Sequence, residues 1–250
     1  PIWVDPIYEL SNPAADAAFN LIGTGILTIA VLAYFVRQRD RYQKRSDDLL
    51  HNILPDEVAT RLKDGSTMIA DDTPSASVLF ADVVGFTPMS ARMSPAELVG
   101  LLNEVFTTFD GLVADLRLEK IKTVGDEYMA AAGVPRGRPD HAHAIADLAL
   151  RMRDHLQANP IQGHHLSLRI GINSGPVTAG IIGTHKFSYD LWGDTVNTAS
   201  RMESEGVPGS IQVSPATYEL IKDAYVCEPR GYIPVKGKSR MMTYLLISSR

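Results

Sequence analysis

The chain has 250 residues, of which 45% are hydrophobic and 21% charged, and its formal net charge is −5. This composition is typical of one large globular domain, or of a medium domain with attached segments. The net acidity excludes the basic surface of a nucleic-acid-binding domain, so we expect no nucleic-acid partner. Cys227 is the only cysteine, which excludes an intrachain disulfide and a Cys/His metal motif. The first residue is proline rather than methionine, so we expect a processed protein or a piece of a longer one.

The N-terminal part is predicted to cross a membrane. Residues 1–13 contain three prolines and are interpreted as an extracytoplasmic segment, followed by a transmembrane helix over residues 14–36. Residues 17–36 carry no formal charge, and at ~1.5 Å per residue they would span ~30 Å, the thickness of a bilayer core. Residues 37–45 hold five basic residues and one acid, which predicts an inner (plasma) membrane protein with all later residues in the cytoplasm. The alternatives are a buried core helix and a signal peptide, but a signal peptide carries its charges before the apolar part.

Residues 37–65 are predicted to form a cytoplasmic helical linker. Apolar residues recur there at steps of three or four, namely Leu49, Leu50, Ile53, Leu54, Val58 and Leu62. This stripe favours a short coiled coil with a second copy of the chain, and the alternative is packing on the chain's own domain. Pro55 is expected to kink or restart the helix, and Gly65 to end it.

Residues 70–250 are predicted to form an α+β domain of the ferredoxin-like type. Strands are expected at residues 76–83, 119–124, 128–133 and 166–174, and helices at 95–118, 140–159 and 194–205. Further short elements include 220–226 and 243–247. The order βαββαβ defines the split βαβ arrangement, with Gly125-Asp126 as a hairpin turn.

Two carboxylates are placed at strand ends in this pattern. Asp82 follows an apolar run and precedes Val83-Val84-Gly85-Phe86-Thr87, and Asp126 lies in the predicted hairpin. Two carboxylates on neighbouring strands would suit Mg²⁺ or Mn²⁺, which prefer oxygen ligands completed by substrate phosphates. The peptide N–H groups after Asp82 would then be free to face an anion. An isolated strand-end Asp is more often a cap or turn residue, so the pair alone does not decide the matter.

A third polar segment covers residues 187–201. Asp190 stands among aromatic and apolar residues, and Asn197 and Arg201 are one helical turn apart, so they share a face. Such a pair can hold a ribose oxygen and a phosphate oxygen, although a simple surface pair is the alternative. The pairs His141/His143 and His164/His165 are interpreted as surface histidines, because a metal site needs three or four converging ligands.

Three motifs together resemble class III nucleotidyl cyclases, and the resemblance covers about residues 50–250. They are Phe80-Ala81-Asp82-Val83-Val84-Gly85-Phe86-Thr87, Lys120-Ile121-Lys122-Thr123-Val124-Gly125-Asp126-Glu127-Tyr128, and the segment from Asp190 to Arg201. His51-Asn52-Ile53-Leu54-Pro55 resembles the linker element that precedes such domains. The layout is similar to the mycobacterial membrane-anchored adenylate cyclases, whose full chains have six membrane helices, of which this chain would retain the last.

The resemblance implies a role for each matching position. Asp82 and Asp126 would bind two Mg²⁺ or Mn²⁺ ions per site, Lys122 and Asp190 would read the base, and Asn197 would orient the ribose. Arg201 would stabilise the transition state, and Lys236, with Lys238 beside it, would hold the terminal phosphates. Phe86 and Thr87 would also contact the substrate. In this family the site is shared between two subunits, so the resemblance implies a homodimer with two composite sites.

The base-reading pair also predicts the nucleotide. Lys122 can donate to N1 of adenine and Asp190 can accept from N6, whereas guanine would need an acceptor at 122 and a small polar residue at 190. An unpaired buried group costs ~1–3 kcal/mol, so we expect ATP as substrate and cyclic AMP as product. A guanylate cyclase and a non-catalytic module that keeps the fold are the alternatives.

Overall fold

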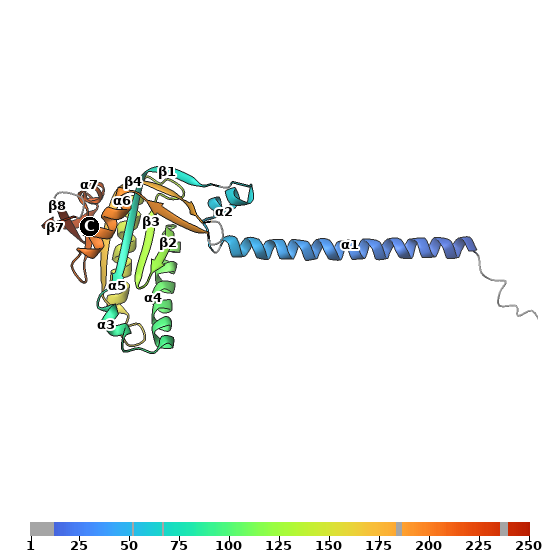
Figure 1. Cartoon of the computed structure of the whole chain (residues 1–250), viewed down its shortest axis with the longest axis horizontal. Coiled ribbons are helices and arrows are strands. Elements are labelled where there is room, and N and C mark those ends of the chain that lie inside the picture. Colours follow the sequence, from blue (N-terminus) through green and yellow to red (C-terminus); the bar gives the residue numbers. More distant parts are fainter. Residues whose placement is uncertain (1–12, 52, 67, 184–186, 236–239) are drawn as a thin grey trace, which may run out of the picture. The chain divides into compact units, whose positions relative to one another are not determined.

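The described part of the first compact unit consists almost entirely of one long helix. The computed structural model describes residues 13–51, 53–66, 68–183, 187–235 and 240–250, and it divides into Pro1–Ile53 and Leu54–Arg250. Helix α1, Pro13–His51, runs without interruption (Figure 1) and has no buried residue. It is long and apolar enough to cross a membrane by length and composition. The predicted span of residues 14–36 lies inside this helix.

The predicted linker helix is divided at Pro55. Helix α2, Asp56–Lys63, begins directly after this proline and belongs to the second unit. Leu54 and Val58 are only 3% and 1% exposed, so this part of the apolar stripe packs on its own unit rather than against a second copy. Leu49 and Ile53 remain exposed, and a coiled coil upstream of Pro55 stays a prediction. The predicted glycine stop is present, with Gly65 at a φ of 89°.

The second unit is built on an eight-stranded sheet. Its spatial order is β2-β3-β1-β4-β6-β8-β7, with β5 paired to β4. The bounds are β1 Ala70–Val83, β2 Glu119–Val124, β3 Glu127–Ala132, β4 Leu168–Ile182, β5 Ser188–Trp192, β6 Ile211–Val213, β7 Tyr225–Ile233 and β8 Met241–Ser249. The predicted βαββαβ core is confirmed and forms the β2-β3-β1-β4 part of the sheet with its helices. The expected element at 220–226 is wrong, because it joins the end of a helix to the start of β7.

Besides α2, five helices accompany this sheet among the described residues of the second unit. They are α3 Phe86–Ser90, α4 Pro95–Asp115, α5 His141–Ala158, α6 Asp194–Ser204 and α7 Pro215–Ile221. Helix α4 starts in a capping box, in which the Ser94 hydroxyl accepts from the Glu97 N–H and the Glu97 carboxylate accepts from the Ser94 N–H. It lies beside β2 and β3 in Figure 1.

The two faces of the sheet carry different helices. On β1, Leu79, Ala81 and Val83 join the main core with residues of α4, α5 and α7. Side chains alternate along a strand, so Phe80 and Asp82 point to the other face, where α6 packs on β4 and β1. The sheet therefore directs Asp82 to the α6 face and away from the main core.

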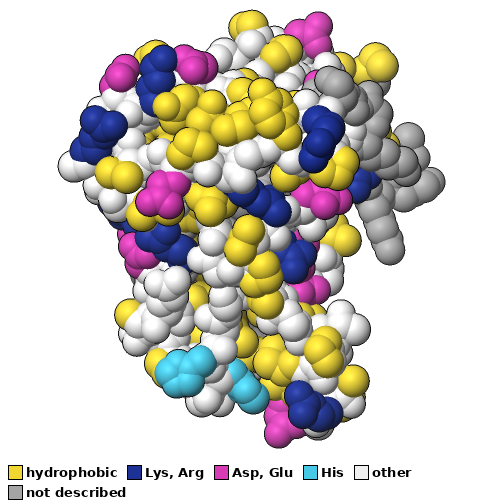
Figure 2. All heavy atoms as spheres, turned by 90° about the vertical axis from the view of Figure 1, so that its left-hand side faces the viewer, with side chains coloured by type: hydrophobic (Ala, Val, Ile, Leu, Met, Phe, Trp, Pro, Cys, Tyr) yellow, Lys and Arg dark blue, Asp and Glu magenta, His cyan; other side chains and the backbone are white. Residues whose placement is uncertain are grey.

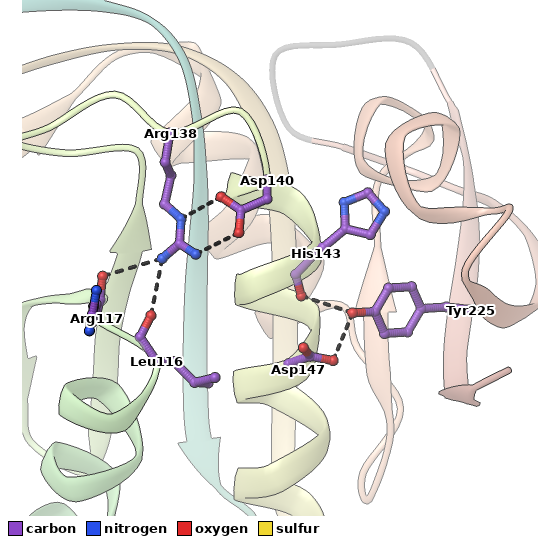
Figure 3. A network of polar contacts seen from close by, with 7 residues as sticks. All are labelled: Leu116, Arg117, Arg138, Asp140, His143, Asp147 and Tyr225. Carbon is purple, nitrogen blue, oxygen red and sulfur yellow. Dashed lines mark hydrogen bonds and ion pairs between the residues drawn. The ribbon is translucent and has the colours of Figure 1, made fainter.

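A polar network fixes the end of α4 and the start of α5. The Arg138 guanidinium donates to both carboxylate oxygens of Asp140 at 2.7 Å and to the carbonyls of Leu116 and Arg117 at 3.0 and 3.3 Å (Figure 3). Arg117 has a φ of 53°, which ends α4 before the predicted residue 118. The bidentate pair holds the pKa of Asp140 down, at about 2.

The same figure shows how β7 is attached to α5. The Tyr225 hydroxyl donates to Asp147 at 2.7 Å and approaches the His143 carbonyl at 3.0 Å. The apolar residues that β7 and β8 leave exposed include Val226, Tyr232 and Ile247. The face drawn in Figure 2 shows hydrophobic side chains gathered in a band that Lys, Arg, Asp and Glu side chains border.

The histidines divide into surface and buried residues. His164 and His165 are exposed as predicted, and histidine side chains reach the surface in Figure 2. The prediction is wrong for His141, which is 5% exposed and lies between the hydroxyls of Ser75 and Ser77, at 2.7 and 2.8 Å. Burial lowers its pKa, so neutral imidazole is favoured, with one ring nitrogen donating and the other accepting.

Candidate active site

Asp82 and Asp126 are brought together by the pairing of β1 with β3. Ala81 pairs with Tyr128, so the end of β1 lies beside the β2–β3 turn that contains Asp126. Gly125, at a φ of 63°, lets this turn form as the sequence predicted. Burial and the neighbouring Asp126 carboxylate raise the pKa of Asp82 to about 6. A half-buried carboxylate whose charge is disfavoured by a neighbouring carboxylate is a place where a cation would be stabilised.

The carboxylate pair fits a hard divalent cation. The described residues contain no group of three or more His, Cys, Asp or Glu side chains that could hold a metal ion. Mg²⁺ needs only one or two protein carboxylates when phosphates and water complete its shell. Asp82 and Asp126 would hold such an ion, and their oxygen donors suit Mg²⁺ or Mn²⁺ rather than a softer metal.

Two further charged residues surround Asp82, and sequence reasoning missed both. Arg169 of β4 pairs with Asp82 across the strands, and its charge acts to lower the pKa of Asp82. Its Nη1 lies 3.8 Å from the Glu203 carboxylate, while its buried Nε has no hydrogen-bond partner among the described residues. Burial raises the pKa of Glu203 to about 7, and the nearby charge of Asp82 adds to this effect. Arg169 was recognisable as the one charged residue in the otherwise apolar run of residues 168–172.

Lys122 and Asp190 form an ion pair on the α6 face of the sheet. The Lys122 Nζ lies 2.5 Å from Asp190 Oδ2, and the side chains are 38% and 17% exposed. The other carboxylate oxygen accepts from the Leu191 N–H at 2.8 Å. Lys122 comes from β2 and Asp190 from β5, so tertiary structure joins two residues 68 positions apart. A donor and an acceptor therefore stand side by side, as recognition of a base edge requires.

Asn197 and Arg201 both lie on α6, as predicted. Asn197 is exposed and Arg201 half-buried, and neither side chain has a hydrogen-bond or ion-pair partner among the described residues. Within the described parts of the chain, no hydrogen bond or ion pair joins Asp82 or Asp126 to Lys122, Asp190, Asn197 or Arg201. The structure thus brings together two separate pairs, and it leaves the side chains of Asn197 and Arg201 without a partner in the described parts of their own chain.

The remaining predicted substrate residues have mixed outcomes. Phe86 and Thr87 start α3 after Gly85, which has a φ of 73°. Phe86 packs against the core, while Thr87 is exposed. The expectation of free peptide N–H groups is wrong at Val84, whose N–H donates to the Ser167 carbonyl at 2.9 Å. Lys236 and Lys238 lie outside the described residues.

Comparisons with known proteins identify the family to which the chain belongs. Residues 68–248 match the family model of the adenylate and guanylate cyclase catalytic domain. The chain therefore belongs to this family of nucleotidyl cyclases. It is 49% identical to a protein named adenylate cyclase from Mycobacterium tuberculosis (strain ATCC 25618 / H37Rv), over 99% of this chain and 58% of the relative. It thus spans little more than half the length of that curated relative.

Solved structures show the same catalytic fold. The guanylate cyclase domain of RhGC from Catenaria anguillulae, in complex with GTP, is 37% identical with a TM-score of 0.70, covering 72% of this chain and all of that domain. The adenylyl cyclase CyaB from P. aeruginosa is 31% identical with a TM-score of 0.68, over 72% of this chain and 97% of the other. Similar folds thus occur in proteins named for either nucleotide, so the fold alone does not identify the substrate.

Proposed function

We propose that the protein is an adenylate cyclase, which converts ATP to 3′,5′-cyclic AMP and pyrophosphate. The observation that carries the substrate choice is the Lys122–Asp190 pair, at 2.5 Å. Lys122 has donors to spare for N1 of adenine, and Asp190 can accept from the N6 amino group. Guanine would present O6 to a carboxylate and an N–H to an ammonium, which leaves both protein groups mismatched. The relative named adenylate cyclase supports the same choice.

Each of the remaining site residues has a proposed role in an intramolecular substitution at phosphorus. The ribose 3′-oxygen loses its proton and forms a bond to the α-phosphorus while the bond to the β-phosphate oxygen breaks. Pyrophosphate leaves with the electron pair and, over the whole reaction, takes up the hydroxyl proton. Asn197 orients the ribose, and Arg201 offsets the negative charge that grows on the α-phosphoryl oxygens. Asp82 and Asp126 would hold two Mg²⁺ or Mn²⁺ ions, which would supply Lewis-acid activation of the hydroxyl and charge neutralisation of the triphosphate.

Arg169 extends this set as a binding residue for the phosphates. Its guanidinium adjoins Asp82 and retains a buried Nε that no described residue accepts from. A planar guanidinium suits phosphate oxygens, which it can contact through two donors. Phe86, Thr87 and Lys236 complete the proposed contacts with the substrate.

The active form in this proposal is a homodimer with two composite sites. Asn197 and Arg201 have no side-chain partners among the described residues, and no described contact links them to Asp82 in the same chain. A second copy would supply them to the Asp82–Asp126 pair, and two-fold symmetry would create two equivalent sites.

The proposal places the catalytic domain in the cytoplasm, tethered through α1 to the inner membrane. The basic residues after residue 36 support this orientation. In a fractionation experiment the full chain should remain with detergent-solubilised membranes, whereas a chain from residue 54 onward should be recovered without detergent. Recovery of the full chain in the soluble fraction would contradict the tether.

Turnover of ATP and GTP by the purified full chain, with Mg²⁺ and Mn²⁺ in turn, tests the proposed activity. ATP should be the preferred substrate with either metal, and Asp126→Ala should abolish cyclic AMP formation. Preference for GTP would make the protein a guanylate cyclase, and an Asp126→Ala variant with unchanged turnover would remove the carboxylate pair from the mechanism.

A further inference from the structure

Helix α6 lies unusually close to strand β4 because glycines face it. A Cβ at Gly171 would overlap the backbone of Met202 and Glu203, and a Cβ at Gly175 would come within 2.7 Å of the Thr195 hydroxyl. Gly171 and Gly175 lie on the same side of β4 as Asn173. The helix that carries Asn197 and Arg201 is therefore seated directly on the backbone of this strand.

Hydrogen bonds fix both ends of α6 on that seat. The Asn173 side-chain amide donates to the Thr195 carbonyl at 2.9 Å, and the Thr195 hydroxyl donates to the Pro176 carbonyl at 2.6 Å. At the other end, the Gln212 amide donates to the Met202 carbonyl at 3.1 Å. Thr195 is one residue into α6, so the Asn173 bond acts on the turn that leads to Asn197.

Asn173 is itself held by a buried polar chain. Its Oδ1 accepts from the Ser214 hydroxyl at 2.6 Å, which fixes the orientation of the amide and directs Nδ2 to Thr195. From Ser214 the hydrogen-bond network continues through Thr217, Ser174 and Ser77 to the His141 ring. The donor–acceptor distances along it lie between 2.6 and 3.3 Å. Asn173 is 7% exposed and Ser214 is 1% exposed. A fully paired buried network specifies one arrangement of its members.

We propose that Asn173 is a positioning residue for the cyclisation: its bond to Thr195 fixes the first turn of α6 and thereby the places of Asn197 and Arg201. The inference rests on the proposed function of these two residues. The inference extends that proposed function, because Asn173 would touch neither the nucleotide nor the cations and would act through α6. A misplacement of about 1 Å at a reacting group can lower a rate by about 100-fold, so loss of this bond should appear in kcat.

The first test compares two buried substitutions in the full chain. Asn173→Ala removes the bond to α6, whereas Ser77→Ala removes hydroxyl bonds of the same chain at its His141 end, away from α6. Both should lower the melting temperature, but only Asn173→Ala should lower kcat, by about 10- to 100-fold with KM for ATP little changed. Asn173→Ser is the milder variant if the alanine variant does not fold. Equal effects of both sites on kcat, or an unchanged kcat for the Asn173 variants, would overturn the proposal.

A second test uses the composite site to locate the defect. In mixed dimers, Asn173→Ala should regain activity with Asp82→Ala, because that partner contributes an intact α6, and should regain none with Arg201→Ala. Rescue by Arg201→Ala instead would place the defect on the metal side and overturn the positioning role. Asp82→Ala mixed with Arg201→Ala is the control for the shared site itself. If the control pair stays inactive, the composite site fails, and the kcat comparison between Asn173→Ala and Ser77→Ala still decides the role of Asn173.

Discussion

Exchanging the base-reading pair should transfer preference from ATP to GTP. The double variant Lys122→Glu with Asp190→Ser puts an acceptor where guanine N1–H arrives and a small hydroxyl opposite O6. Both positions must change together, because Lys122→Glu alone would place two carboxylates at the present 2.5 Å contact. The Leu191 N–H of β5, which now donates to Asp190 Oδ1, can donate to the hydroxyl of the new serine.

The size of the effect follows from the burial of the pair. Asp190 is 17% exposed and Lys122 is 38% exposed, so a mismatched base leaves a largely desolvated carboxylate without a donor. Leaving such a group unpaired costs about 1–3 kcal/mol, which is about 5- to 150-fold in kcat/KM. The two positions are in contact, so their effects should not simply add. We therefore expect the ATP-to-GTP ratio of kcat/KM to fall by about 10- to 150-fold.

The assay is the formation of cyclic AMP from ATP and of cyclic GMP from GTP, with Mn²⁺ at fixed concentration. Lys120→Glu with Asp110→Ser is the matched control, because Lys120 and Asp110 form a 2.7 Å ion pair that joins β2 to α4. The control should lose stability and keep its ATP-to-GTP ratio. Equal losses of both activities in the Lys122/Asp190 variant, with an unchanged ratio, would refute the assignment of base reading to this pair.

Three further expectations follow from the charges. Mn²⁺ should raise the melting temperature of the native chain but not of Asp126→Asn, because the ion relieves the repulsion at Asp82; an equal shift in both would contradict the metal site. Burial raises the pKa of Glu119 from 4.5 to about 7, so the folded state binds the Glu119 proton more tightly than the unfolded state does. The stability that this proton contributes is present at low pH and is lost as pH rises from about 4.5 to 7. The unfolding free energy of Glu119→Gln minus that of the native chain should therefore be about 1–3 kcal/mol larger at pH 8 than at pH 4, measured by denaturant titration. An equal difference at the two pH values would refute the burial argument. Arg169→Ala should raise KM for ATP by about 10-fold or more if its guanidinium binds phosphate, whereas Arg153→Ala, which removes an ion pair distant from Asp82 in the sequence, should not.

The order of elements was predictable because apolar periodicity dictates it. The hairpin at Gly125-Asp126 and the cap at Ser94 are local features, and both are present. The break of the linker helix at Pro55 was predicted, but the packing of its apolar stripe was not, because the stripe does not reveal that Leu54 and Val58 are buried in the second unit. The burial of His141 was missed for the same reason, since only the tertiary fold places Ser75 and Ser77 against its ring.

The site was predicted through its motifs rather than through spacing alone. Asp82 with Asp126, and Lys122 with Asp190, were named from the sequence, and the structure brings each pair together. Arg169 and Glu203 were missed, because a lone Arg in a strand and an Asp- and Glu-containing helix resemble ordinary surface features. Their relation to Asp82 depends on the register between β1 and β4 and on the close seat of α6.

The central claim is that two chains complete one catalytic site, and a mixed dimer tests it directly. Asp82→Ala and Arg201→Ala should each be inactive alone. When they are mixed in equal amounts and allowed to exchange subunits, half of the dimers are mixed and each contains one intact site, so activity should return to about a quarter of the native value. No recovery in samples whose subunit exchange is verified would contradict the account.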